Sequence, residues 1–178
     1  MLNNKIAMKL FYLIFFFINV SIVHSQDNIF DVCRNGSIEE ITKLYKANSN
    51  IINKKNDQGY TPLILACYHG NESIVTFLID KVDDINGSSE YGTPLMAAVV
   101  KGNKKITKLL LDKKAKTNIA DANGTTALHY ATLFKKNEIA KLLVEAGANY
   151  NLKDGNNKSA YDYALNNNNK ELLTLFKK

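Results

Sequence analysis

The chain has 178 residues, of which 46% are hydrophobic and 22% are charged, so it can form one globular domain and is too apolar for disorder. Basic residues total 23 against 17 acidic ones, a net charge of +6, but Arg34 is the only arginine. Because arginine supplies bidentate contacts to phosphate and guanine, this composition disfavours nucleic acid as a partner. Two cysteines exclude a disulfide-rich scaffold and a four-cysteine zinc site.

The N-terminal segment has the pattern of a secretory signal peptide. Residues 1–9 contain two lysines and no acid, residues 10–23 are almost entirely apolar, and Val23-His24-Ser25 resembles a cleavage site before Gln26. We therefore expect residues 1–25 to be a cleaved signal peptide and residues 26–178 to be an exported domain, periplasmic or secreted, without membrane attachment. An uncleaved anchor would need about 20 apolar residues, and it remains an alternative together with a buried helix.

The remainder of the chain repeats itself. The hexapeptide at residues 61–66 (TPLILA) returns after 32 residues as 93–98 (TPLMAA), after 33 more as 126–131 (TALHYA), and after another 33 in degenerate form as 159–164 (SAYDYA). A second apolar phase with i, i+4 spacing follows each copy at the same period; its residues are Ile74/Leu78, Ile106/Leu110, Ile139/Leu143 and Leu172/Phe176. Two amphipathic helices per unit predict a solenoid of stacked helix pairs.

These motifs resemble the ankyrin repeat. The match includes the Thr-Pro-Leu starts, the Gly70-Asn71 and Gly102-Asn103 breaks between helices, and the Gly147-containing segment EAGAN. The resemblance implies an all-α ankyrin-repeat solenoid with short β-hairpin-like loops. It would contain three central repeats between two divergent caps. The N-terminal cap would comprise residues 28–54, and the C-terminal cap would begin at Ser159.

Three departures from the repeat predict local irregularities. Lys135 stands where the two preceding repeats have glycine, so this turn should be strained or differently shaped. The loop before Thr93 is one residue shorter than its counterparts, which should redirect one finger of the array. The run Asn166–Asn169 occupies the position of a break between two helices, so we expect a turn there.

The residue types that support catalysis are sparse. The resemblance implies that His129 forms a structural hydrogen bond across neighbouring turns, and His69 falls on the last turn of a first helix. No nucleophile, phosphate loop or set of metal ligands accompanies either histidine. We expect neither an enzyme nor a metal or cofactor; a hydrolase using His69 or His129 is the disfavoured alternative.

Cys33 and Cys67 fall on neighbouring first helices, one register apart. An exported protein meets an oxidising compartment, so the two alternatives are a disulfide between these cysteines and a pair of buried free thiols. Stacked helices lie about 8–10 Å apart, farther than the roughly 7 Å that bridged Cα atoms allow, and this favours the thiols.

The resemblance also places candidate partner-binding positions on the first helices and the loop tips. These residues are Tyr60, Tyr68, His69, Glu90, Val100, Lys101, Asn123, Leu133 and Phe134. Five of them (Tyr60, Tyr68, Val100, Leu133 and Phe134) would form an apolar strip typical of a protein-binding surface. Inward rotation of Leu133 and Phe134 is the alternative. Lysines 104, 105, 108, 113, 114 and 116 are interpreted as a solvated face, with a patch for an acidic partner as the second interpretation.

We therefore expect a non-catalytic, monomeric protein–protein interaction module that acts outside the cytoplasm through its concave face and finger tips. The partner would be a single protein for which this chain is an immunity or accessory factor; a secreted effector that binds a host protein is the alternative, and a self-associating scaffold is another. Glycans at the sequon residues Asn86 and Asn123 would crowd the finger tips, so a working face favours bacterial export.

Overall fold

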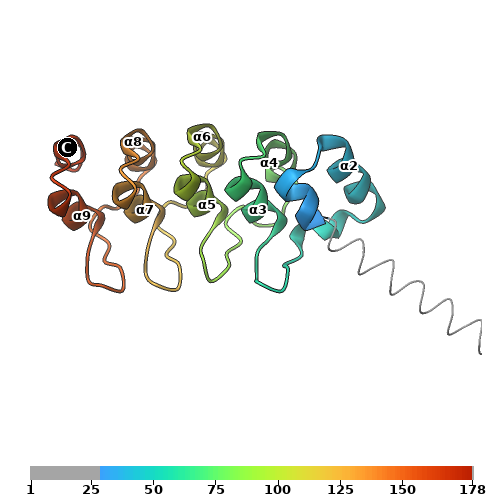
Figure 1. The fold of residues 1–178 in the computed structure, drawn as a ribbon, viewed down its shortest axis with the longest axis horizontal. Helices are drawn as coiled ribbons and strands as arrows, with labels where there is room; N and C mark the ends of the chain where they lie inside the picture. Colours follow the sequence, from blue (N-terminus) through green and yellow to red (C-terminus); the bar gives the residue numbers. More distant parts are fainter. Residues whose placement is uncertain (1–28, 178) are drawn as a thin grey trace, which may run out of the picture.

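The computed structural model describes residues 29–177, so the signal peptide expected at residues 1–25 falls outside the described residues. Successive helix pairs stand side by side in one row, and long loops project from one side of it (Figure 1). The helices, after a helical segment at residues 29–35, are α2 (Ile38–Ala47), η1 (Ser49–Asn53), α3 (Pro62–His69), α4 (Glu72–Ile79), α5 (Pro94–Lys101), α6 (Lys104–Asp112), α7 (Ala127–Leu133), α8 (Asn137–Glu145), α9 (Ala160–Asn166) and α10 (Lys170–Leu175).

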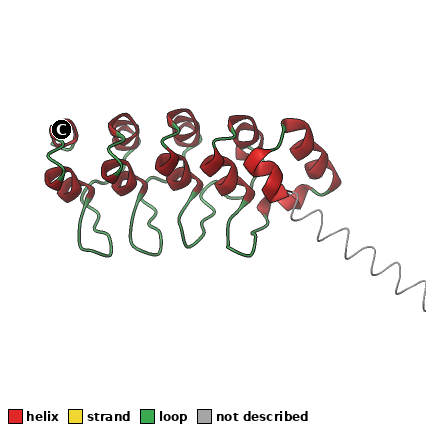
Figure 2. Cartoon of the chain, in the orientation of Figure 1, coloured by secondary structure: helices red, strands yellow, loops and turns green. Residues whose placement is uncertain are grey.

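The helices form two layers. The first helices of the pairs contact one another in the order α3, α5, α7 and α9, and the second helices do so in the order α2, α4, α6, α8 and α10. The loops before the first helices form fingers without regular strands (Figure 2); across residues 29–177 their β-type pairing is limited to the isolated bridges Ser89–Gly92 and Ala120–Thr126. This arrangement confirms the predicted solenoid of helix pairs.

The Thr-Pro sequence starts the first helices as expected. The hydroxyl of Thr61 accepts a hydrogen bond from the backbone N–H of Ile64 at 3.2 Å, and Thr93 accepts one from Met96 at 3.3 Å. Proline occupies the first helical position after each threonine, where no intrahelical N–H bond is lost. In the last repeat Ser159 and Asp162 replace this pattern with a reciprocal capping box.

Asparagines cap the second helices α4, α6 and α10, and two of these asparagines also join neighbouring repeats. Asn71 caps α4 through Oδ1, while its Nδ2 donates to the carbonyl of Gly36 in the preceding pair at 2.9 Å. Asn169 likewise caps α10 and donates to Asn137 Oδ1 of the preceding repeat at 2.8 Å. One side chain therefore satisfies a helix end and fixes the stacking of two neighbours.

The turns between the paired helices require a left-handed residue. Gly70 and Gly102 adopt φ values of 75°, whereas Lys135 and Asn168 occupy the corresponding position at φ 53° and 51°. The irregularity predicted at Lys135 is therefore a residue with a Cβ held in a conformation that favours glycine. The turn predicted within Asn166–Asn169 is confirmed.

The core runs along the interior between the two layers. The i, i+4 pairs of the second apolar phase are all buried, with exposed fractions of 3% or less. The N-terminal pair adds a short 3-10 helix, not expected from the sequence, that buries Ile51 and Ile52. Each pair exposes an apolar face that only its neighbours cover, so the repeats are stable as an array.

Cys33 and Cys67 are buried free thiols in this core. Burial raises the pKa of Cys33 to about 12 and that of Cys67 further still, with the neighbouring Cys33 adding to the latter shift. No helix within residues 29–177 combines the length and the apolar character needed to cross a membrane.

Candidate binding groove

A groove of about 460 Å³ crosses the face made by the first helices and the fingers. Three successive repeats contribute to it. It is lined by Tyr60, Ile64, Leu65, Tyr68, His69, Tyr91, Thr93, Met96, Ala97, Val100, Tyr130 and Phe134. None of these lining residues is an acid, a lysine or an arginine, so the surface of the groove is largely apolar and aromatic.

The groove follows directly from the repeat register. Counting from each N-cap threonine, the residues at +3, +4, +7 and +8 share one side of the first helix. In α3 these positions supply Ile64, Leu65, Tyr68 and His69 to the groove. In α5 the +3, +4 and +7 residues continue this surface, and in α7 the +4 and +8 residues do, because the helices stack side by side.

A short finger closes one wall of the groove. In the finger before α3, the side-chain oxygen of Asn56 accepts from the backbone N–H groups of Gln58 and Tyr60. The finger before α5 is one residue shorter, and Ser89 stands there in place of the asparagine. Its hydroxyl oxygen accepts one backbone hydrogen bond, from the N–H of Tyr91 at 3.2 Å. The shorter turn brings the Tyr91 ring onto the Tyr60 ring, with centroids 5.6 Å apart and planes inclined by 28°. The predicted redirection of this finger therefore completes the groove.

The other wall is formed by Tyr130 and Phe134, whose rings are stacked with centroids 6.0 Å apart. The Tyr130 hydroxyl donates to Asp121 Oδ2 at 2.6 Å, which ties α7 to its finger. Burial, followed by the hydrogen bond and charge of Asp121, raises the pKa of Tyr130 to about 12. The phenol is therefore neutral over the physiological range and serves as a fixed apolar wall.

Positive charge gathers at the end of the groove farthest from the fingers. We define the basic edge as Arg34, Lys101 and Lys136, with the His69 ring beside them. Lys101 Nζ lies 4.7 Å from the centroid of the Tyr68 ring. Lys136 reaches back along Gly102, where a Cβ would lie 2.8 Å from its Nζ. Burial and the charges of Arg34 and Lys101 lower the pKa of His69.

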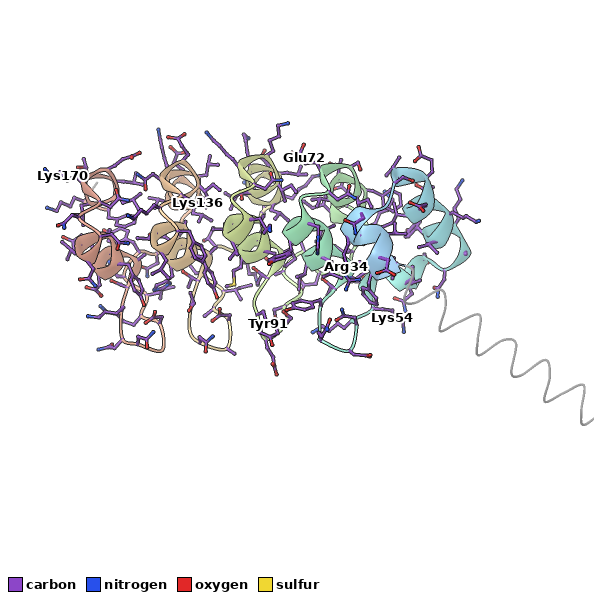
Figure 3. All side chains as sticks on the ribbon, viewed as in Figure 1. Arg34, Lys54, Glu72, Tyr91, Lys136 and Lys170 are labelled. Carbon is purple, nitrogen blue, oxygen red and sulfur yellow. The ribbon has the colours of Figure 1, made fainter. Side chains whose placement is uncertain are left out.

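The labelled side chains in Figure 3 show the two sides of this face: Tyr91 on its finger, and Arg34 and Lys136 toward the helix ends. Lys101 and Lys136 form no ion pair within residues 29–177, whereas Arg34 pairs with Asp31 at 2.7 Å.

The structure brings five of the nine predicted partner-binding residues together on the groove. These are Tyr60, Tyr68, His69, Val100 and Phe134, and Lys101 lies at the edge. Glu90 faces a separate hollow between two fingers, while Asn123 and Leu133 do not line the groove. The alternative in which Leu133 and Phe134 turn inward is wrong, because they are 37% and 50% exposed.

Sequence reasoning missed Tyr91, Tyr130 and the +3 and +4 residues of α3 and α5 as groove residues. Tyr130 was detectable in principle, because it occupies the repeat position of Leu65 and Ala97. Tyr91 was not, because its placement depends on the geometry of the shortened turn.

His129 has a structural role in the described residues. It is fully buried; its Nδ1 accepts from the N–H of Thr126 at 3.1 Å, and its Nε2 lies 3.1 Å from the carbonyl of Lys158 in the next finger. An Nε2–H tautomer satisfies both contacts, so the ring joins two successive repeats. Residues 29–177 contain no cluster of three or more histidine, cysteine or acidic side chains that could hold a metal ion.

The lysine-rich second helix lies on the opposite side of the repeats and is largely neutralised. Lys104 pairs with Glu138 at 2.9 Å, Lys105 with Glu72 at 3.6 Å, and Lys113 with Asp80 at 2.5 Å, each across a repeat boundary. Solvent screens exposed pairs of this kind, so they add little to stability. They form a solvated face, which favours the first interpretation of this cluster.

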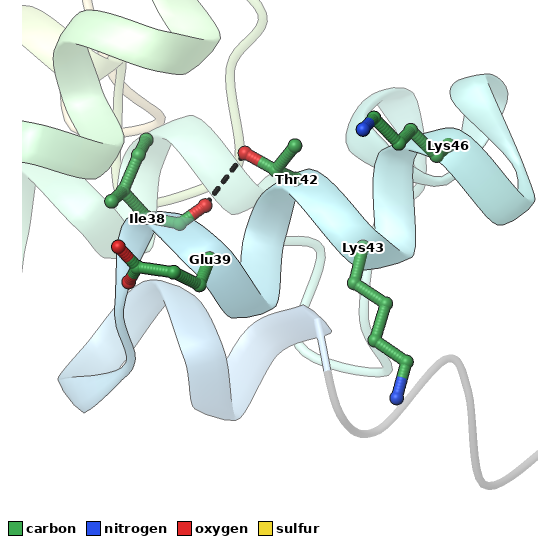
Figure 4. Close-up of a pocket in the computed structure, with 5 residues that line it drawn as sticks. All are labelled: Ile38, Glu39, Thr42, Lys43 and Lys46. Carbon is green, nitrogen blue, oxygen red and sulfur yellow. Dashed lines mark hydrogen bonds between the residues drawn. The ribbon is translucent and has the colours of Figure 1, made fainter.

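A hollow on α2 is lined by Ile38, Glu39, Thr42, Lys43 and Lys46 (Figure 4). All five residues come from one helix, and the Thr42 hydroxyl donates to the carbonyl of Ile38 at 2.6 Å. The hollow is therefore the surface of a single helix, without converging groups from other elements.

The comparisons with known proteins agree with this architecture. The family model "Ankyrin repeats (3 copies)" matches residues 29–121, 83–154 and 113–178. The chain belongs to the ankyrin-repeat family, and its repeats define a protein–protein interaction module with protein partners. Members of this family are generally non-catalytic.

Two curated proteins are similar over one segment. The chain is 39% identical to acyl-CoA-binding domain-containing protein 6 of Bos taurus over 59 residues, and 40% identical to the Homo sapiens protein of that name over 52 residues. These alignments cover 33% and 29% of this chain but only 21% and 18% of the relatives, so the chain spans about a fifth of their length.

Proposed function

We propose that the protein is a non-catalytic binding module that acts outside the cytoplasm and holds one partner protein in the groove on its first helices. The observation that carries this proposal is the groove itself. Exposed aromatic residues from three repeats meet there, although the packing of the repeats does not require aromatic side chains at these positions. Tyr68 is 43% exposed and Phe134 50% exposed. Large, partly exposed aromatic side chains are typical of binding hot spots.

A rigid array suits this role. The fingers and helices are fixed by hydrogen bonds between repeats, such as those from Asn71 and Asn118 to carbonyl groups of neighbouring repeats. A surface that is already formed loses little conformational freedom on association. The proposed location rests on the apolar segment at residues 10–23 and its cleavage pattern.

Affinity capture tests the binding function. The C-terminally tagged full chain is produced in an exporting host, and proteins retained from extracytoplasmic extract are compared with those retained by a Tyr68→Ala/Phe134→Ala variant. Leu165→Ala is the matched control, because Leu165 is 46% exposed and does not line the groove. One protein retained by the native chain and the control but lost by the double variant supports the proposal. Equal retention by all three baits contradicts the groove as the binding site.

The origin of the captured protein separates the two roles. A captured protein from the organism in which this chain naturally occurs supports an immunity or accessory factor, which we favour. A protein captured only from the material of an infected host supports a secreted effector. Intact-mass measurement of the exported product tests the location independently. The expected product begins at Gln26, and uncleaved protein retained in the cytoplasm would contradict export.

A further inference from the structure

The charges around the groove are unevenly distributed between its two sides. The basic edge contributes Lys101 and Lys136, which form no ion pair within the described chain, together with Arg34, which pairs with Asp31. The finger side has the exposed acids Asp57 and Glu90 together with Lys55, in a hollow separate from the groove. Between them lies the uncharged aromatic surface described above.

The acid nearest the aromatic wall is already occupied. Asp121 accepts from the Tyr130 hydroxyl through one oxygen, and from the N–H groups of Asn123 and Thr125 through the other. Asp121 forms no ion pair with Lys101 or Lys136, so both cations stay available to a ligand. A cationic ligand is also disfavoured, because Lys101 already lies over the face of Tyr68 and would repel a second cation.

The dimensions of the groove fit a segment of polypeptide. Stacked helices lie about 8–10 Å apart, so three repeats span roughly 20 Å. An extended chain advances about 3.3 Å per residue, and about six residues would cross this distance. Alternate side chains of such a segment would point into the groove.

We propose that the groove binds an extended acidic segment of a partner protein, with an aromatic or branched aliphatic side chain between Tyr68, Val100 and Phe134 and a carboxylate at the basic edge. This inference rests on the proposed protein-binding function and specifies the chemistry of its partner. Lys101 and Lys136 orient the segment, because they attract its carboxylate to the basic edge. The apolar anchor supplies affinity, while the carboxylate supplies specificity.

Selection from a phage-displayed random heptapeptide library tests this chemistry without a known partner. The baits are the native full chain, Lys101→Glu, Tyr68→Ala/Phe134→Ala and the control Leu165→Ala, each first compared with the native chain by circular dichroism and urea unfolding. Lys101, Tyr68 and Phe134 are exposed, so these substitutions leave the core intact.

The native chain and Leu165→Ala are expected to enrich peptides that combine Asp or Glu with aromatic, leucine or isoleucine residues. The double variant should lose these peptides. Lys101→Glu should weaken the acidic clones by about tenfold, since it replaces an attraction by a repulsion, and should select neutral or basic clones instead. Binding of the native clones should weaken with added salt.

Three results would overturn the inference, and they differ in what they imply for the proposed function. Neutral or basic clones that the double variant loses would refute the acidic segment while preserving the groove as a protein-binding site. No enrichment, or clones that the double variant retains, would refute the groove and the proposed function together. A concentration-dependent mass in light scattering that the double variant abolishes would assign the groove to a second copy of the chain, which also overturns the proposal.

Discussion

Tyr91 stacks on Tyr60 across two adjacent fingers, and this contact exists because the finger before α5 is one residue shorter than its counterparts. Gly92, at φ 108°, allows the turn to close against Met96, which itself lines the groove. A deviation from the repeat therefore creates one wall of the candidate binding surface.

Tyr91→Ala is expected to alter the groove with little cost in stability. Tyr91 is 65% exposed, so the variant should lose less than about 1 kcal/mol of unfolding free energy in urea. Tyr60→Ala should cost more, because Tyr60 is half-buried and packs against the core. A larger loss for Tyr91→Ala than for Tyr60→Ala would show that the shortened finger supports the fold.

His129→Ala should be strongly destabilising. The substitution leaves a cavity, removes the acceptor for Thr126 N–H and breaks the link to the Lys158 carbonyl, so we expect a loss of about 2–4 kcal/mol. His69→Ala, at an exposed position, serves as the control and should change stability by less than about 0.5 kcal/mol. Similar urea midpoints for the two variants would refute the structural role of His129.

Lys135→Gly should stabilise the protein by about 0.5–1 kcal/mol, because glycine adopts the left-handed conformation without the steric cost of a Cβ. Gly70→Lys, which places a lysine at the matching turn of the first central repeat, should be destabilising. Thermal or urea unfolding measures both changes, and a destabilised Lys135→Gly would mean that the lysine side chain makes a compensating contact.

Proton binding by His69 reports on the basic edge. Its pKa in the folded protein should lie below the value of about 6.5 for an unperturbed histidine, and an NMR pH titration of the ring resonances measures it. Because the folded state binds this proton less readily, His69 lowers stability as pH falls through the unfolded pKa toward the folded one, and has no effect above it. Lys101→Met should raise the folded pKa; an unchanged value would place Lys101 too far away to act on His69.

The two thiols should be unreactive in the folded protein. Both are buried with raised pKa values, and the reactive species is the thiolate. Ellman's reagent should detect neither thiol within minutes under native conditions and both in guanidinium chloride. A protein that yields no thiols after unfolding without reductant would instead contain a disulfide.

Much of the architecture could be predicted from the sequence. The Thr-Pro starts, the glycine breaks and the i, i+4 apolar pairs are local signals, since they encode helix caps, turns and buried faces within a few residues. Their recurrence every 32 or 33 residues determines the stacking, because equivalent positions must then lie side by side. The same register is enough to place Tyr68, His69, Val100 and Phe134 on one face.

The tertiary structure decided which of these positions form one groove. Tyr91 reaches Tyr60 only through the geometry of a shortened turn, and Lys136 extends its side chain back to the previous repeat beside Gly102. Glu90 lies in a separate hollow between two fingers, and Asn123 lines neither that hollow nor the groove. A periodic sequence specifies the register of neighbouring repeats, whereas the direction of a loop side chain depends on backbone angles and on contacts with residues roughly 30 positions away. For this reason the sequence alone determined the frame and its binding face, and only the folded array determined the shape and charge of the groove.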